Sequence, residues 1–427
     1  MDVKIKKIKK LSGEITIPSD KSISHRAVII SGLTGGSLNI NNFSLGADCH
    51  SSLNIMKNLG CEIEFKEAQK LSFKAPKKLM NHNNVNLDCG NSGTSMRLLS
   101  GVLAAQDFDS VLVGDSSLSK RPMKRIIEPL ELMGAKIDHN NFKAPLKIWG
   151  SVSELQGITY HSKLASAQVK SAILLAGLNA KGSTVFSEPY KSRNHTENLL
   201  TYFGADLKID KNIVKISKSE LIPKDIDICG DISSAAFFLV AACIIPNSSI
   251  IIRNVGANET RGGILEILEK MGANIEYLNK YEKSNESVCD IKISYSDLKA
   301  ITIEGEIIPR LIDEIPVICV LATQANGTTY IKDAQDLRNK EADRIKSMVV
   351  ELKKIGADIQ ETQDGFIING KTMLKGDAII NCYGDHRIAM SLYIAGLICN
   401  KPIQIKDFHW VDISFPEFLN LMDKLKN

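Results

Sequence analysis

The stretch PSDKSISHRAVIISGL, residues 18–33, joins a polar beginning to an apolar end. Its second half is apolar almost all round, which is typical of a helix buried in a protein core. Its first turns instead carry Lys21, Ser22, His25 and Arg26. We therefore expect a buried helix whose N-terminal end serves a purpose other than packing.

Five further segments repeat this pattern of a polar first turn, rich in helix-capping residues, followed by an apolar helix. They begin at Gly90, Ser166, Gly230, Asp313 and Gly384. The combination of a polar helix head and an apolar helix body is therefore systematic and indicates an internal repeat.

A second series consists of a helix that ends on a glycine and runs into an alternating strand, as in LEKMGANIE at Gly272. The glycine suits a left-handed helix C-cap, and copies recur about every 70 residues. The segment FLNLMDKLKN (418–427) resembles a sixth helix without its strand, which KIKKIKKL (4–11) could supply. The other members end on Gly60, Gly134, Gly204 and Gly356.

Six units, each with two helices and several strands, predict an α/β fold with the apolar helices inside and the amphipathic helices against sheets. PSDKSIS at the start of the first repeat resembles CGDISSA at the start of the fourth. We place two chain crossovers there. One domain is then predicted to hold residues 20–228, and the other residues 1–19 plus 229–427, with three repeats each.

Composition argues for an ordinary globular protein. The 427 residues are 44% hydrophobic and 24% charged, with a formal net charge of +4, which disfavours disorder and a dedicated nucleic-acid binder. The nine cysteines include no C-x-x-C pair and indicate reduced core thiols in a cytoplasmic protein. The lysine-rich N-terminus precedes no signal-type apolar region, and no run is long enough to span a bilayer.

The polar helix heads predict an anion site. The first amides of a helix and the positive end of its dipole attract anions, although such heads can also simply cap helices at the surface. Capping does not explain the basic residues in these turns, which are Lys21, Arg26, Arg97 and Arg387. Arg121 precedes a proline, which favours an extended backbone from which it could reach a ligand, although a solvated loop arginine has the same local sequence.

Two further polar segments carry candidate ligands. EPYKSRNHTENLL contains a capping box at Asn194 and Glu197, with Arg193 just ahead of it. RNKEADRIKSM is expected to place Lys340, Glu341 and Arg344 on adjacent turns of one helix, which can equally be a salt-bridged surface. No Walker A loop or H-E-x-x-H motif is present, so phosphate binding is predicted to use side chains and helix ends, without a metal or cofactor.

The motifs as a set resemble those of the 5-enolpyruvylshikimate-3-phosphate (EPSP) synthase family, also called 3-phosphoshikimate 1-carboxyvinyltransferases. They are SDKSISHRA, GNSGTSMRL, RPM, SAQVKSAILLAGL, GDISSAAFF, LIDEIPV, KEADR and GDHRIAM, in order between residues 18 and 416. The resemblance implies transfer of the enolpyruvyl group of phosphoenolpyruvate to the 5-hydroxyl of shikimate 3-phosphate, on the route to chorismate. It also implies a two-domain inside-out α/β barrel of six βαβαββ repeats, three per domain.

The resemblance implies a function for individual residues. Glu341 would be the acid that protonates the methylene carbon and Asp313 the base, and Lys21 could share either proton step. The implied ligands of shikimate 3-phosphate are Lys21, Ser22, Arg26, Ser166, Gln168, Arg193, Asp313 and Lys340. Those of phosphoenolpyruvate are Lys21, Gly93, Arg121, Gln168, Arg344 and Arg387.

The resemblance also bounds the partners. It implies two small-molecule substrates, no nucleic acid, no membrane and a monomer that closes around its substrates. Near the C-terminal Phe415–Pro416 pair, where many relatives carry a phosphoenolpyruvate-binding lysine, this chain has Ile413.

Two alternatives belong to similar folds. UDP-N-acetylglucosamine enolpyruvyl transferases share the repeat pattern, but typically have Lys-Asn in place of Lys21-Ser22 and a cysteine in the loop that reads GDSSLSKRPM here. An RNA-end-binding module is the second alternative, because related units occur in RNA phosphate cyclases. The modest charge and the lack of interleaved aromatic residues disfavour it.

Overall fold

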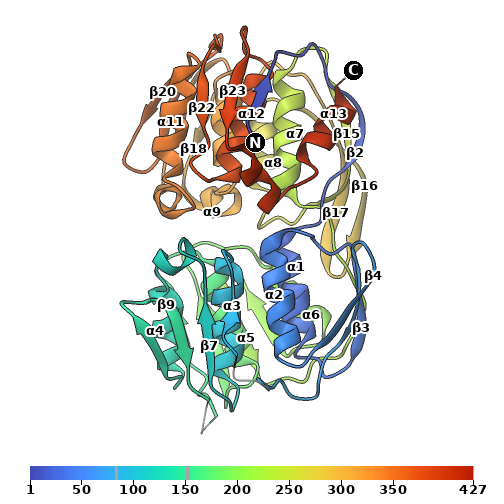
Figure 1. Cartoon of the computed structure of the whole chain (residues 1–427), viewed down its shortest axis with the longest axis vertical. Coiled ribbons are helices and arrows are strands. Elements are labelled where there is room, and N and C mark those ends of the chain that lie inside the picture. The colour runs from blue at the N-terminus through green and yellow to red at the C-terminus, as the bar shows by residue number, and fades with distance from the viewer. Residues whose placement is uncertain (82–84, 151–153, 427) are drawn as a thin grey trace. The chain divides into compact units, whose positions relative to one another are not determined.

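The structure is a computed structural model that describes residues 1–81, 85–150 and 154–426. The chain forms two compact units (Figure 1). The N-terminal unit comprises Ser19–Ile228 and Glu282–Glu286. The C-terminal unit comprises Met1–Pro18, Cys229–Tyr281 and Ser287–Asn427.

The described part of the N-terminal unit contains three four-stranded sheets. Across each sheet, the strands lie in the order first, second, fourth and third, where the numbers give their order along the chain within one repeat. The first sheet is β14 (Ile226–Asp227), β3 (Ser37–Asn41), β5 (Lys70–Lys74) and β4 (Glu62–Glu67). The second is β6 (Leu87–Asp88), β7 (Ser110–Val113), β9 (Lys143–Ile148) and β8 (Ile137–Asn140). The third is β10 (Thr159–His161), β11 (Ser183–Ser187), β13 (Ile213–Ser217) and β12 (Leu207–Asp210).

Among its described residues, the C-terminal unit repeats this arrangement with one strand fewer in its last sheet. Its first sheet is β2 (Ser12–Thr16), β15 (Ser249–Gly256), β17 (Glu286–Ser294) and β16 (Asn274–Lys283). The second is β18 (Thr302–Ile303), β19 (Gly327–Ile331), β21 (Phe366–Gly370) and β20 (Asp358–Glu361). The third is β22 (Ile379–Asn381), β23 (Ile403–Lys406) and β1 (Val3–Ile5).

The first strands of repeats one and four are exchanged between the sheets. β2, at the start of repeat one, pairs in parallel with β15 of repeat four. β14, at the start of repeat four, pairs in parallel with β3 of repeat one. The N-terminal strand β1 pairs with β23, so the expectation that the N-terminal segment completes the last repeat is confirmed.

Each repeat contributes one helix that is buried along nearly its whole length, because the side chains beyond its polar first turns are largely apolar on all sides. In the N-terminal unit these helices are α1 (Lys21–Ser31), α3 (Gly93–Ala104) and α5 (Ala167–Gly177). In the C-terminal unit they are α7 (Ile232–Ile244), α10 (Ile315–Ala322) and α12 (His386–Gly396), which pack against one another.

The second helix of each repeat is amphipathic, with one face against the unit and the other in solvent. These helices are α2 (Ala47–Asn58), α4 (Lys124–Leu132), α6 (His195–Tyr202), α8 (Gly263–Lys270), α11 (Arg344–Lys354) and α13 (Phe418–Leu425). The glycines at 60, 134, 204, 272 and 356 all have φ between 85° and 100°, which confirms their prediction as left-handed helix ends.

One helix start differs from its prediction. A short helix, α9 (Ile308–Leu311), precedes α10, so Asp313 lies in the turn between two helices rather than in the first turn of α10. Pro316 explains the late start, because proline is compatible with the first turn of a helix but not with its interior.

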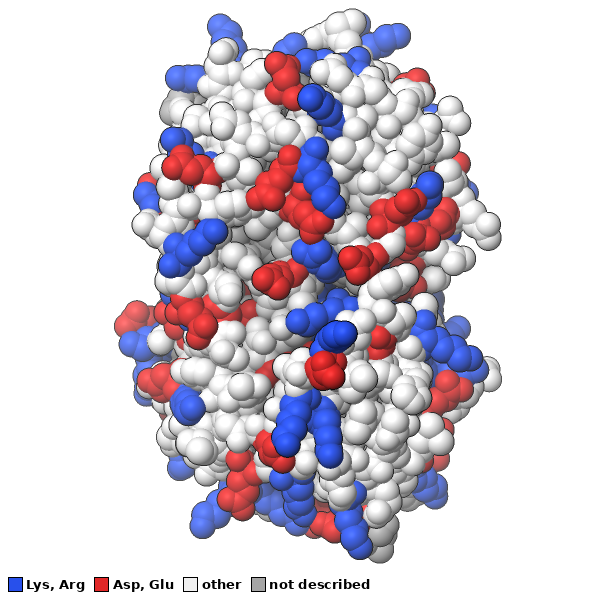
Figure 2. All heavy atoms as spheres, turned by 180° about the vertical axis from the view of Figure 1, so that it is seen from behind, with Lys and Arg blue, Asp and Glu red and all other residues white. Residues whose placement is uncertain are grey.

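The surface and the thiols agree with the composition. On the face seen in Figure 2, basic and acidic side chains are interspersed over both units. All nine cysteines are buried and free of disulfides, as the sequence predicts. Among the helices of the described residues, none has the length and apolarity needed to cross a membrane.

Candidate active site

In the N-terminal unit, buried hydrogen bonds join the first turns of the three core helices. Arg26 of α1 donates to Ser171 of α5, with 3.0 Å between Nη2 and Oγ. His25 of α1 contacts Ser52 of α2 at 2.8 Å, and Ser52 contacts Ser95 of α3 at 2.7 Å. The polar helix heads of this unit therefore lie together.

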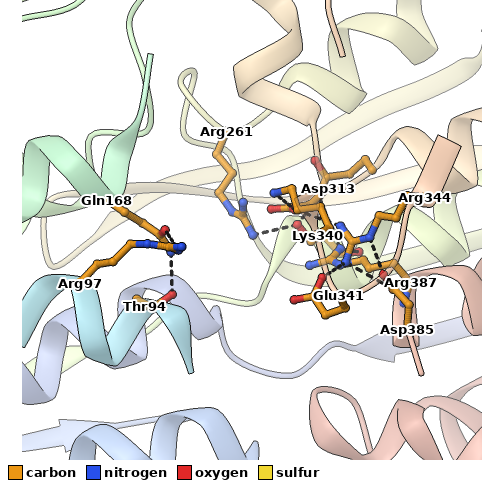
Figure 3. Close-up of polar contacts among 12 residues, drawn as sticks. Thr94, Arg97, Gln168, Arg261, Asp313, Lys340, Glu341, Arg344, Asp385 and Arg387 are labelled. Carbon is orange, nitrogen blue, oxygen red and sulfur yellow. Dashed lines mark hydrogen bonds and ion pairs between the residues drawn. The ribbon is translucent and has the colours of Figure 1, made fainter. Parts of the chain in front are cut away.

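Two arginines lie over the N-terminus of α3. A side chain at Gly93 would place its Cβ 3.0 Å from Nη1 of Arg97 and 3.6 Å from Nη1 of Arg121. Arg97 also donates to Oε1 of Gln168 at 2.5 Å, and Gln168 donates to Thr94 at 3.1 Å (Figure 3). Helix amides and guanidinium groups thus converge close to Gly93, which suits an anion.

The loop that carries Arg121 is also fixed. Arg121 has φ −74° and ψ 137°, so the extended backbone predicted from the following proline is confirmed. Its Nη2 donates to Asn91 at 3.0 Å, and Asn91 donates to Asp115 at 2.8 Å. Arg121 is therefore held toward the glycine-rich turn.

Other predicted ligands of the N-terminal unit lie at helix starts. Nζ of Lys21 is 2.8 Å from a carboxylate oxygen of Asp48, and both side chains are partly exposed. The carbonyl of Ser22 accepts a hydrogen bond from Arg26 at 2.9 Å. Ser166 is the N-cap residue of α5.

The capping box predicted at Asn194 and Glu197 is wrong. Within the described residues, the side chain of Asn194 makes no capping bond to α6. Glu197 instead pairs with the buried Lys170, with 2.7 Å between Oε1 and Nζ. A buried ammonium ion requires a counter-charge, and this requirement outweighs a helix cap. Arg193 precedes α6 and is partly buried.

In the C-terminal unit, Arg344 joins three carboxylates (Figure 3). Its Nε is 2.7 Å from Asp385, Nη2 is 2.6 Å from Glu341, and Nη1 is 3.4 Å from Asp313. Burial alone would lower the pKa of Arg344, but the charges of Asp385, Glu341 and Asp313 raise it overall. The guanidinium therefore stays charged and orients the two predicted catalytic carboxylates.

The prediction that Lys340, Glu341 and Arg344 share one helix is wrong. Asp343 caps α11 by accepting from the amide of Lys346 at 3.0 Å, so the helix begins only at Arg344. Lys340 has an extended backbone after the 3₁₀ helix Gln335–Asn339. It still lies in the same group, because its Nζ is 3.2 Å from Asp313.

Arg387 is positioned by the start of α12. The side chain of Asp385 caps this helix and accepts from the Arg387 amide at 2.8 Å. Nη1 of Arg387 lies 3.6 Å from the buried carboxylate of Glu314 and 3.5 Å from the carbonyl of Ser233. The predicted phosphoenolpyruvate ligand therefore has a fixed direction.

Sequence reasoning missed three members of this group, which are Glu314, Asp385 and Arg261. Arg261 is buried and lies 3.1 Å from Asp231 and 2.8 Å from the hydroxyl of Ser233 (Figure 3). Glu314 and Asp385 lie within the motifs LIDEIPV and GDHRIAM, which were their only sequence signal, and Arg261 lies in none of the motifs. Each positively charged side chain of this group contacts a carboxylate, which holds for Lys340, Arg344, Arg387 and Arg261. The group is therefore less positively charged than the basic residues of the helix heads alone led us to expect.

No three His, Cys, Asp or Glu side chains in residues 1–81, 85–150 and 154–426 are grouped so that they could hold a metal ion. Ile413 ends the 3₁₀ helix Phe408–Ile413.

A family profile described as EPSP synthase (3-phosphoshikimate 1-carboxyvinyltransferase) matches residues 5–422. The chain belongs to the EPSP synthase family. A 3-phosphoshikimate 1-carboxyvinyltransferase of Thermodesulfovibrio yellowstonii is 53% identical over 99% of both chains, and that of Bacillus subtilis is 47% identical over 98% of both. A solved EPSP synthase structure from Acinetobacter baumannii has a TM-score of 0.90 and 40% identity, covering 100% of this chain and 98% of that chain.

These comparisons confirm three predictions. The motif resemblance to EPSP synthases, the two-domain α/β fold of six repeats, and the carboxyvinyltransferase function are all borne out. The relatives carry the name of the shikimate enzyme, so the aminosugar transferase alternative is set aside.

Proposed function

We propose that the residues described above bind the two anionic substrates and carry out the two proton transfers of carboxyvinyl transfer. The observation that carries this proposal is the buried Arg344, which contacts both Asp313 and Glu341. A single guanidinium that orients an acid and a base at fixed distances is suited to a reaction that needs both.

Shikimate 3-phosphate and phosphoenolpyruvate each carry a phosphate and a carboxylate, so their ligands must supply positive charge. For phosphoenolpyruvate we propose Lys21, Gly93, Arg121, Gln168, Arg344 and Arg387. The convergence of Arg97 and Arg121 on the first turn of α3 supports this assignment, because the helix amides and both guanidinium groups attract the same anion.

For shikimate 3-phosphate we propose Lys21, Ser22, Arg26, Ser166, Gln168, Arg193, Asp313 and Lys340. The ion pair between Lys340 and Asp313, at 3.2 Å, supports the pairing of a ligand with the base. Lys340 would hold the substrate near the carboxylate that receives its hydroxyl proton.

We propose that Glu341 donates a proton to the methylene carbon of phosphoenolpyruvate, which makes C2 electrophilic. Asp313 accepts the proton of the 5-hydroxyl as that oxygen forms a bond to C2, which gives a tetrahedral intermediate. The bond between C2 and the phosphate-ester oxygen then breaks, phosphate leaves with that oxygen, and a methyl proton returns to the enzyme, which forms the enol ether. Lys21 could share either proton transfer.

The contact between Arg344 and Glu341 bears on when Glu341 can act. At 2.6 Å the guanidinium favours the ionised carboxylate, which cannot donate a proton. A phosphoenolpyruvate anion that binds Arg344 would share its charge and so favour protonation of Glu341. The acid would thus become available when the substrate is bound.

We also propose that the enzyme works as a monomer in the cytoplasm. Nine cysteines without a disulfide are consistent with a reducing compartment. Size-exclusion chromatography with light scattering would test the monomer.

The function is tested by measuring phosphate release from phosphoenolpyruvate. We expect release that depends on shikimate 3-phosphate, with a product whose mass includes the added carboxyvinyl group. UDP-N-acetylglucosamine serves as the control acceptor, and turnover with it but not with shikimate 3-phosphate would overturn the proposal.

A further inference from the structure

We infer that Lys170, Glu188 and Glu197 form a buried clamp that positions Arg193 and Arg26 for shikimate 3-phosphate. Lys170 is then a positioning residue for the reaction, acting through these two arginines. This inference rests on the proposed function, because it takes Arg193 and Arg26 to be ligands of that substrate.

The ammonium group of Lys170 has all three of its protons engaged. Nζ lies 2.8 Å from Oε1 of Glu188, 2.7 Å from Oε1 of Glu197 and 3.1 Å from the carbonyl oxygen of Ser192. The side chains of the lysine and both glutamates are at most 2% exposed. A lysine ammonium group has three hydrogen-bond donors and no acceptor, so its three acceptors here together fix the position of Nζ.

The clamp fixes the residue just before Arg193. The amide and the hydroxyl of Ser192 both donate to Oε1 of Glu188, at 2.8 and 2.9 Å. The carbonyl of Ser192, which forms the peptide bond to Arg193, accepts from Lys170. Every polar group of Ser192 is therefore held by the clamp, and the backbone at Arg193 starts from a fixed point.

The same helical turns hold Arg26. Ser171 and Thr196, the neighbours of Lys170 and Glu197 in sequence, contact each other at 2.6 Å. Arg26 donates to both, with Nε 2.7 Å from Thr196 and Nη2 3.0 Å from Ser171. The ion pair that joins α5 to α6 thus fixes the two hydroxyl groups that orient Arg26.

A purely structural function would not require this charge pattern. Burying a lysine with two glutamates is costly, and an apolar side chain of similar volume often gives equal or greater stability in a helix core. The other core-facing residues of α5 after Ser171 are apolar, namely Ala172, Ile173, Leu174, Leu175 and Ala176. Lys170 is the one charged residue of α5, and it lies at the end of the helix that carries Gln168 and Ser171.

The test is a mutant cycle in which one arm changes Lys170 and the other arm changes Arg193 and Arg26 together. We expect Lys170→Met to weaken shikimate 3-phosphate binding about tenfold to a hundredfold, measured by calorimetry, and to change kcat much less. In an Arg193→Ala, Arg26→Ala background the same substitution should weaken binding by less than about threefold, because the residues through which it acts are gone. Glu188→Gln, which keeps the shape of the side chain, should give a smaller effect in the same direction.

Leu146→Ala is the matched control. Leu146 is fully buried in β9 of the same unit, so its truncation destabilises the fold without contacting the clamp. We expect its binding of shikimate 3-phosphate to equal that of the wild type. Equal weakening by Leu146→Ala, or full additivity in the cycle, would overturn the clamp. If Arg193→Ala and Arg26→Ala themselves left binding unchanged, the proposed ligand assignment would fail instead.

If Lys170→Met does not fold, Glu188→Gln carries the cycle alone. An unchanged dissociation constant in that variant would then reject the inference.

Discussion

Acidification should destabilise the N-terminal unit through His25, a group outside the proposed catalytic residues. Burial lowers the pKa of His25 from 6.5 to about 3, and the charges of Lys21 and Arg26 act in the same direction against the opposing charge of Asp48. The folded imidazole is therefore neutral over the whole range in which the unfolded chain takes up a proton.

The sign and size follow from this difference. Above pH 6.5 neither state binds the proton, so the contribution is constant. Between pH 6.5 and about 3 only the unfolded state binds it, so stability falls as the pH falls. From pH 7 to pH 5 the free energy of unfolding should decrease by about 2 kcal/mol because of this group alone.

Urea unfolding followed by tryptophan fluorescence measures this effect. Trp410→Phe leaves Trp149, in the N-terminal unit, as the remaining tryptophan. The unfolding free energy of this background is compared with that of the same background carrying His25→Gln. From pH 7 to pH 5 the protein with His25 should lose about 2 kcal/mol more than the His25→Gln protein, because the other titratable groups contribute equally to both. Parallel pH profiles for the two proteins would refute the reasoning.

Three further predictions concern the C-terminal unit and the anion site. Glu341→Gln should lower kcat about a hundredfold to ten-thousandfold with little change in substrate affinity, and a large loss of affinity with turnover intact would show the assignment to be wrong. Arg121→Met should raise KM for phosphoenolpyruvate about tenfold to a hundredfold in steady-state assays, while shikimate 3-phosphate binding stays unchanged; equal loss for both substrates would contradict it. Asp385→Asn replaces one of the three carboxylates that contact the buried Arg344 with a neutral amide and should lower the unfolding free energy by about 3 kcal/mol, read from Trp410 fluorescence in a Trp149→Phe background. A loss below about 1 kcal/mol would argue against a buried ion pair.

The repeat architecture could be predicted because its signals are local. A glycine at a left-handed helix end and a capping residue before an apolar helix act within a few residues, and each signal occurs several times. Gly134 and Gly272 show the predicted conformation for this reason. The pairing of β1 with β23 also followed, since a repeat with a missing strand leaves one place to fill.

The side-chain network could not be predicted, because its partners are far apart in sequence. Arg26 and Thr196 are 170 positions apart, and Arg344 and Asp385 are 41 apart. Local patterns carry no information on such pairs. Lys170 illustrates the loss, since a lysine in an apolar helix has no local explanation until Glu188 and Glu197 are seen beside it.

Local rules also failed where a stronger interaction competed. The helix predicted to carry Lys340 begins instead at Arg344, because Asp343 is a better N-cap. The capping box at Asn194 was lost when Glu197 was drawn to a buried cation. In the first case the sequence pattern did not show which residue caps the helix, and in the second it did not show which group the Glu197 carboxylate contacts.

The exchange of β2 and β14 constrains how the polypeptide can assemble during synthesis. β2 leaves the ribosome early, yet its neighbour β15 is made only after the whole of Ser19–Ile228, and β1 must wait still longer for β23. β1 and β2 therefore lack their strand partners while Ser19–Ile228 is synthesised, and the many lysines of residues 1–18 discourage premature association with other strand edges. A fragment consisting of residues 229–427 alone would lack β2, the parallel neighbour of β15. A circular permutant that begins at residue 229, with its original C-terminus joined to Met1, would place nearly all of the C-terminal unit in one continuous segment that ends at residue 18.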